Sequence, residues 1–204
     1  MKLQNLFLGL GATAVTKPSQ TGVAPALWDG KCFYPQPDTT FALDTYPGRW
    51  YQLAGTLARF TAGCKCISAR YDINEDGSLY VNNTCQRGDK QTFIEGEAVA
   101  ADEAYGKVGV LRVRFPVQPP LACDGPNYIV QEYTGDLAIV QSANFSNLFI
   151  LSRAQHVDED CLDASCRDRD PDDEVAGWID RAVELGTPRE KIAKTDQNDC
   201  NNDF

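Results

Sequence analysis

The stretch Tyr46-Pro47-Gly48-Arg49-Trp50-Tyr51, continued by the alternating run 52–57, decides the fold of this chain. Proline and glycine mark a turn, and the aromatic pair opens a segment with the period of two typical of a β-strand. Trp50 alone would also fit an ordinary buried core tryptophan. The stretch gains meaning from a later segment, 147–153, which reads Asn-Leu-Phe-Ile-Leu-Ser-Arg and predicts another apolar strand, ending at Arg153.

Together the two segments resemble the signature of the lipocalin family. In that family a Gly-X-Trp motif starts the first strand of an eight-stranded barrel, and an arginine after the last strand stacks on the tryptophan at the closed end. A planar guanidinium suits an indole face. The resemblance implies structural roles for Gly48, Trp50 and Arg153. It covers roughly Gly30 to Cys200 and is similar to the apolipoprotein D and insect bilin-binding branches of the family.

The segments between these two motifs alternate apolar and polar residues and are separated by turn residues. This pattern predicts antiparallel strands with one apolar face. With the first strand they make eight, the number that closes an up-and-down barrel around one small ligand. An immunoglobulin-like sandwich is the structural alternative. The expected strands after the first are 65–73, 79–86, 91–100, 107–115, 127–134, 136–142 and 147–153.

One amphipathic helix is expected after the barrel. Val175, Trp178, Ile179, Ala182 and Val183 recur with helical spacing, and Gly186 follows them. The apolar stripe predicts packing on the outside of the barrel, whereas a sandwich would not require such a helix. A short second turn is expected at 187–190.

The chain is expected to form a single exported domain. Residues 1–14 have the charged start, short apolar run and small residues of a secretory signal peptide, with a frayed tail as the alternative. Residues 15–30 show no period and predict an extended arm, and 31–200 form the lipocalin domain. No segment is long enough to span a membrane. The expected protein is secreted and extracellular.

The net charge of −10 makes nucleic acid and anionic membrane surfaces poor partners. Much of the acidity lies in 158–174, where nine carboxylates accompany Arg167 and Arg169. A solvated loop is the preferred interpretation, because no calcium-binding spacing is present. The sequence leaves the oligomeric state open.

Eight cysteines in an exported chain indicate disulfide bonds. Zinc is the alternative, but Cys64-X-Cys66 lacks the usual ligand spacing and His156 is the only histidine. The lipocalin resemblance implies a bond between Cys66 and Cys200. It also maps Cys32 to a family cysteine whose usual partner is missing, for which Cys123 is the suggested replacement. The remaining pairs would be Cys64 with Cys85 and Cys161 with Cys166. Two sequons predict glycosylation at Asn82 and Asn144.

An apolar calyx is a pre-formed site for a hydrophobic small molecule. Tyr71 and Phe149 match pocket aromatics of apolipoprotein D, and Asn83 and Gln131 are candidate polar handles. The full set of predicted ligand-binding residues is Ala69, Tyr71, Val81, Asn83, Ile94, Leu111, Val113, Ile129, Gln131 and Phe149. The sequence therefore predicts a carrier of a small hydrophobic ligand. Core filling is the alternative role for each of these residues.

The alternative function is a lipocalin-fold enzyme, such as an isomerase, de-epoxidase or cyclase of a lipophilic molecule. Nucleophilic catalysis needs a base within reach, and His156 is expected on the surface. No catalytic residue, metal or cofactor is assigned. A third class is a lipocalin that binds proteins through its mouth loops, but no feature of the sequence supports it.

Overall fold

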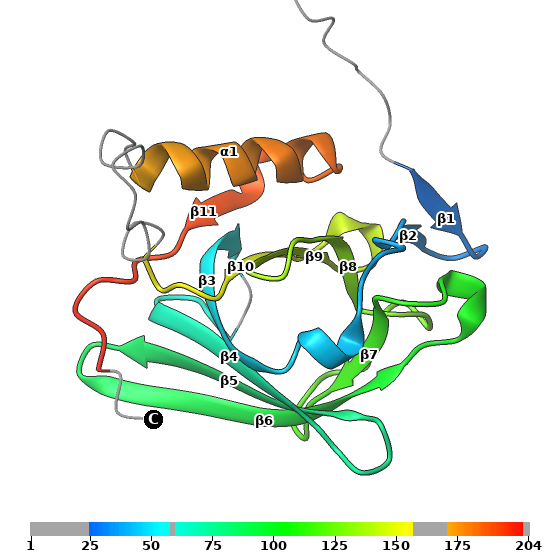
Figure 1. Ribbon diagram of the computed structural model, residues 1–204, viewed down its shortest axis with the longest axis horizontal. Helices are drawn as coiled ribbons and strands as arrows, with labels where there is room; N and C mark the ends of the chain where they lie inside the picture. The colour runs from blue at the N-terminus through cyan, green and yellow to red at the C-terminus, as the bar shows by residue number, and fades with distance from the viewer. Residues whose placement is uncertain (1–24, 58–59, 157–170, 202–204) are drawn as a thin grey trace, which may run out of the picture.

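The computed structural model describes residues 25–57, 60–156 and 171–201 of the 204-residue chain. Its centre is a barrel of eight antiparallel strands, each paired with the next along the chain. Pairing of the last strand with the first closes the barrel. Figure 1 shows the strands curving round to form the barrel. The barrel strands are β3 (Gly48–Thr56), β4 (Lys65–Ile73), β5 (Leu79–Arg87), β6 (Lys90–Ala100), β7 (Val110–Arg114), β8 (Tyr128–Tyr133), β9 (Leu137–Gln141) and β10 (Leu148–Ser152).

The strand register places Trp50 and Tyr71 at the same end of the barrel. Trp50 of β3 pairs with Ala69 of β4, and Gly48 pairs with Tyr71. The short 3₁₀ turn η1 (Leu43–Thr45) precedes them at this end, which we call the floor. The segments 57–64, 115–127 and 142–147 join strands at the opposite end, which we call the mouth.

The C-terminal tail fills a gap between β3 and β4. These strands pair only over 48–51 and 68–71, and the short strand β11 (Ile192–Lys194) pairs with the remainder of β3 at 54–56. Beyond β11, the buried amide nitrogen of Gln197 donates to the carbonyls of Gln52 and Ile67, both at 2.9 Å. The tail therefore satisfies backbone groups that a direct β3–β4 pairing would otherwise use.

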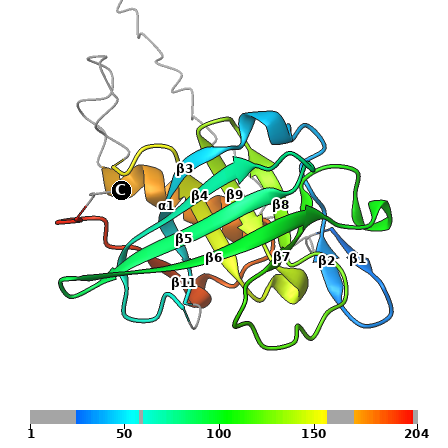
Figure 2. The same cartoon turned by 90° about the horizontal axis from the view of Figure 1, so that it is seen from below.

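Two elements cover the outside of the barrel. Helix α1 (Pro171–Glu184) packs Ile179 and Ala182 against the outward residues of β3, β9 and β10, as the apolar stripe predicted. A second cluster lies under the hairpin of β1 (Ala26–Trp28) and β2 (Phe33–Pro35), where Tyr34 meets Val110 and Ile129. In both ribbon views the hairpin lies on the side of the molecule away from the C-terminal tail (Figures 1 and 2).

The eight expected strands and the helix are confirmed, with three differences. The hairpin β1–β2 and strand β11 were not predicted, because three-residue strands are too short to show alternation. Strand β7 begins at Val110 instead of residue 107, since Gly106 and Gly109 adopt positive φ in the segment before it. The remaining 3₁₀ turns are η2 (Glu103–Tyr105), η3 (Ala143–Phe145) and η4 (Arg189–Lys191). No helix in the described part of the chain is long and apolar enough to cross a membrane.

Candidate functional site

The floor is sealed by Trp50, which is fully buried. The guanidinium carbon of Arg153 lies 3.8 Å from the centre of its indole ring. Arg153 also donates hydrogen bonds to the carbonyls of Arg49 at 3.0 Å and Thr45 at 2.9 Å. The indole nitrogen of Trp50 donates to the carbonyl of Tyr46 at 2.9 Å. Stacking and hydrogen bonds thus tie the turn before β3 to the end of β10.

Three tyrosine hydroxyls meet directly above this seal. The Tyr46 and Tyr128 hydroxyl oxygens are 2.5 Å apart, and those of Tyr128 and Tyr71 are 3.0 Å apart. All three side chains are buried. Burial raises the pKa of Tyr71 to about 12, and it raises the pKa of Tyr46 and Tyr128 well above the usual value. The three phenols therefore stay neutral at physiological pH.

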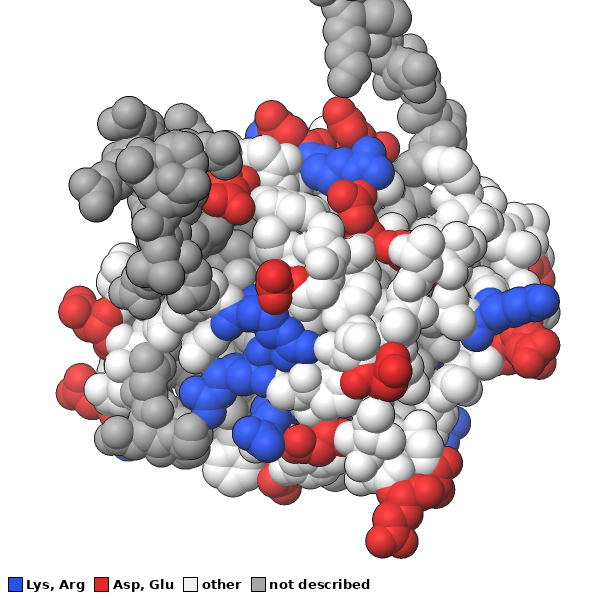
Figure 3. All heavy atoms as spheres, viewed as in Figure 1, with Lys and Arg blue, Asp and Glu red and all other residues white. Residues whose placement is uncertain are grey.

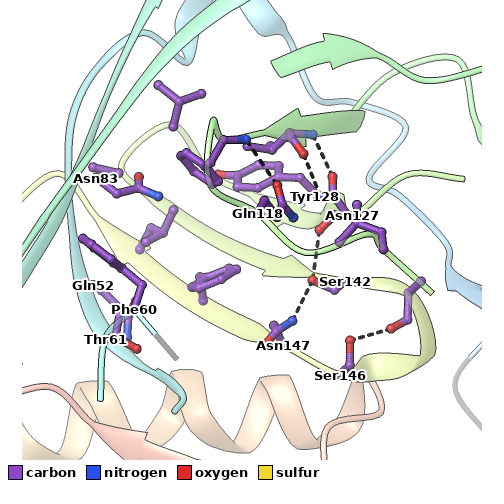
Figure 4. A pocket seen from close by; sticks show the side chains of 18 of the residues that line it. Gln52, Phe60, Thr61, Asn83, Gln118, Asn127, Tyr128, Ser142, Ser146 and Asn147 are labelled. Atoms are coloured by element: carbon purple, nitrogen blue, oxygen red, sulfur yellow. Dashed lines mark hydrogen bonds between the residues drawn. The ribbon is translucent and has the colours of Figure 1, made fainter. Parts of the chain in front are cut away.

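A cavity of about 420 Å³ extends from these tyrosines to the mouth. Its volume falls within the range of small-molecule sites. Ala69 and Val81 form apolar wall near the floor, and Ile67 lies nearer the mouth on β4. Phe60, Phe115 and Leu121 come from the mouth segments. Figure 4 shows polar side chains of several segments around it, among them Asn83, Gln118, Asn127, Tyr128 and Asn147.

The cavity lining differs from the outer surface in its charge. Among the described residues that line the cavity there is no Asp, Glu, Lys, Arg or His. Acidic and basic side chains lie on the outside, and the face shown in Figure 3 carries a cluster of basic side chains with acidic ones around it. An ion held against these described residues would lose its hydration without gaining a counter-charge from them.

Six of the ten predicted ligand-binding residues line the cavity: Ala69, Tyr71, Val81, Asn83, Val113 and Phe149. Leu111 also belongs to the inner core but is packed within it and does not line the open space. Ile94 is half-buried beside Asn83, its pairing partner in β5, outside the described lining. That the six residues bind a ligand stays a prediction.

The orientation predicted for Ile129 and Gln131 was wrong. Ile129 packs outward against the β2 hairpin, and the Gln131 amide donates to the Leu185 carbonyl after α1 at 3.3 Å. Their neighbours Tyr128 and Val130 belong to the inner core instead. Strand β8 has apolar residues on both faces because its outer face is also covered, so alternation could not distinguish inside from outside.

Sequence reasoning missed Tyr128 and Tyr46, as well as the mouth residues Phe60, Phe115 and Gln118. The tyrosines could have been suspected from their places beside the Gly-X-Trp motif and at the start of a strand. Phe115 ends the expected strand 107–115 on the face of Val113, so alternation could have found it. Phe60 and Gln118 lie in loops, where no periodicity reveals the direction of a side chain.

Three disulfides within the described part of the chain join segments at the mouth end. They are Cys32–Cys123, Cys64–Cys85 and Cys66–Cys200, the same pairs that the sequence suggested. Cys32–Cys123 fastens the β1–β2 hairpin to the segment 115–127, and the backbone nitrogen of Phe33 donates to Asn144 Oδ1 at 2.8 Å. Cys66–Cys200 fastens the tail to β4. The mouth is therefore held by covalent bonds across elements far apart in the sequence.

Several other expectations have simple outcomes. His156 is half-buried after β10 and lies outside the described lining.

Glycosylation stays a prediction at both sequons. At Asn144 a glycan would displace the contact of its amide nitrogen with Cys123 Sγ, at 3.4 Å. The signal peptide, the pair Cys161–Cys166 and most of the acidic segment 158–174 lie outside the described residues.

The family model of the lipocalin-like domain matches residues 41–169. Temperature-induced lipocalin-1 of Arabidopsis thaliana is 30% identical over 77% of this chain and 80% of its own. Apolipoprotein D of Cavia porcellus is 29% identical over 84% of this chain and 85% of its own. Among solved structures, insecticyanin of Manduca sexta shares the fold, with a TM-score of 0.52, 20% identity and coverage of 82% of this chain and 89% of its own.

Proposed function

The chain belongs to the lipocalin family, and from this we propose that it binds one small hydrophobic molecule reversibly inside the barrel and carries it. The observation that supports the proposal is the cavity of about 420 Å³, which has no charged side chain among its described lining residues and is sealed at one end by Trp50 and Arg153. A site that is closed at one end and reached from the other suits a whole-molecule ligand that enters and leaves intact.

The driving force is the removal of apolar ligand surface from water, at roughly 25 cal/mol per Å² before the costs of ordering are subtracted. Much of the lining is already formed by strand residues such as Ala69, Val81 and Val113. A wall formed before binding keeps the ordering cost small.

The chemistry of the lining supports binding more than catalysis. General acid–base catalysis needs a group whose pKa lies near the working pH. The described lining offers no carboxyl or imidazole group, and burial moves the pKa of Tyr71 further from neutrality, to about 12. We therefore place carriage ahead of a lipocalin-fold enzyme.

We further propose that the protein works in an oxidising, extracellular compartment. Three disulfides support this, because such bonds persist outside the reducing cytosol. Residues 1–14 would act as the export signal.

Two experiments test the proposed carriage. Native mass spectrometry of the protein from its own source should reveal a bound lipophilic molecule. Fluorescence titration with the neutral probe N-phenyl-1-naphthylamine should show saturable binding that Phe149→Asp abolishes, since an unpaired charge would face the ligand. Phe93→Asp is the matched control, because Phe93 is 66% exposed and lies outside the described lining. Equal probe binding by parent and folded Phe149→Asp would place the ligand elsewhere, and turnover of a lipophilic substrate would favour the enzyme.

A further inference from the structure

The tyrosine chain at the floor carries polar hydroxyl groups, which the apolar wall above it lacks. Tyr71 and Tyr128 both line the cavity, whereas Tyr46 lies behind them. The hydroxyl of Tyr128 is the middle member, 2.5 Å from that of Tyr46 and 3.0 Å from that of Tyr71. The chain therefore runs from the sealed core to the surface of the cavity.

The number of protons sets the direction of this chain. Three hydroxyls carry three protons, and the two hydrogen bonds between them use two. Among the described residues, Tyr128 is the only hydrogen-bond partner of the Tyr46 hydroxyl. A buried hydroxyl that leaves its proton without an acceptor is costly. Donation from Tyr46 to Tyr128 is therefore favoured. If the chain continues from Tyr128 to Tyr71, the Tyr71 proton is left for a group inside the cavity.

The surroundings select against a charged acceptor. The described lining contains no basic side chain that could pair with a carboxylate, and the raised pKa values keep all three phenols neutral. A carboxylate at the floor would lose its hydration and gain only one hydrogen bond from a neutral donor. The free-energy cost of removing a ketone oxygen from water is much smaller. The floor is thus matched to an oxygen acceptor without charge.

We infer that the ligand carries a neutral oxygen acceptor, such as a ketone carbonyl, at the end that enters the barrel first, and that the Tyr71 hydroxyl donates to it. This inference rests on the proposed carriage of a hydrophobic molecule in the same cavity. Tyr71 is then a specificity-determining residue, and Tyr128 and Tyr46 are positioning residues that act through it.

The first test compares two probes of equal chain length, 2-tetradecanone and tetradecanoate, by displacement of N-phenyl-1-naphthylamine at pH 7. We expect the ketone to bind about tenfold or more tightly than the carboxylate, because only the carboxylate brings an unpaired charge into the cavity. The reporter contains no oxygen, so its own affinity measures the apolar cavity independently of Tyr71.

The second test removes the donor. Tyr71→Phe should weaken 2-tetradecanone about five- to tenfold, the loss of one hydrogen bond, and leave the affinity of N-phenyl-1-naphthylamine unchanged. The infrared carbonyl band of ¹³C-labelled ketone should lie at lower frequency in the parent and return toward its value in hydrocarbon in the variant. Tyr133→Phe is the matched control, because the Tyr133 hydroxyl bonds to Thr45 and lies outside both the chain and the described lining.

The outcomes separate this inference from the proposed function. If the reporter binds but the carboxylate competes as well as the ketone, or if Tyr71→Phe leaves the carbonyl band unchanged, the inference is wrong and the carriage proposal stands. If neither the reporter nor either tetradecyl probe binds the parent, both fail.

Discussion

The floor and the mouth of the barrel are held together by different forces. At the floor, buried aromatic rings pack closely, with Tyr46 and Trp50 centroids 5.0 Å apart, and hydrogen bonds join the residues that meet there. At the mouth the strands surround open space, and the three disulfides link the loops and the tail. Where a cavity replaces the core, packing cannot supply the stability, and covalent bonds that restrict the unfolded chain take its place. A barrel that must stay open at one end is thus stabilised by its closed end and by the cross-links around the opening.

The largest expected effect comes from breaking the floor. Trp50→Ala should lower the free energy of unfolding by about 3–5 kcal/mol, because it leaves a large cavity in the packed core and removes the surface on which Arg153 stacks. Denaturant unfolding measures the loss. Trp28→Ala is the matched control on the mouth-side hairpin, where the side chain is 53% exposed, and should cost less than about 1 kcal/mol. Equal losses for both would contradict the role assigned to the floor.

The next largest effect comes from removing a disulfide bond at the mouth. Replacing both Cys66 and Cys200 by serine should cost about 2–4 kcal/mol, because the bond closes a loop of 134 residues. The near-ultraviolet dichroism of the floor aromatics should persist. The matched variant removes Cys64–Cys85, which closes only 21 residues and should cost about 1–2 kcal/mol less in the chain-entropy account. A loss of the floor signal together with the Cys66–Cys200 bond would show that the two ends are not independent.

The smallest expected effect is a pH dependence at the mouth-side hairpin. The Asp29 carboxylate accepts hydrogen bonds from the backbone nitrogens of Cys32 and Lys31, which lower its pKa to about 2. Because the folded pKa lies below the unfolded value of about 3.9, the stabilisation is complete above that pH and is lost as the pH falls toward about 2. Hydrogen-exchange protection of the hairpin amides should fall over this window, whereas floor amides should not respond.

Asp29→Asn provides the control for this pH effect, since asparagine keeps an acceptor oxygen but does not titrate. Its hairpin protection should be the same at both ends of the window. If the parent and the variant lose protection equally, some other group controls the hairpin.

The eight strands and the outer helix could be predicted because their signal is local. Alternation along β4 places Ile67, Ala69 and Tyr71 on one face, and all three line the cavity. The stripe of Ile179 and Ala182 likewise indicates one buried helix face, and the structure buries it against β3, β9 and β10. In such elements the period of the backbone turns the order of residues directly into a direction of side chains.

Where alternation fits both side-chain directions, or does not apply, only the tertiary structure decides which way a side chain points. Strand β8 has apolar residues on both faces, and only the coverage by the hairpin and the segment after α1 turns Ile129 and Gln131 outward and Tyr128 inward. The hydroxyl chain joins residues 46, 71 and 128, whose separation in sequence hides their contact. The sequence by itself predicted the barrel and its Trp50 and Arg153 seal, because those depend on periodicity and recognisable motifs, and the family resemblance implied the pair Cys66–Cys200. The polarity of the cavity floor depends on how distant strands face one another, and that is fixed only when the barrel closes.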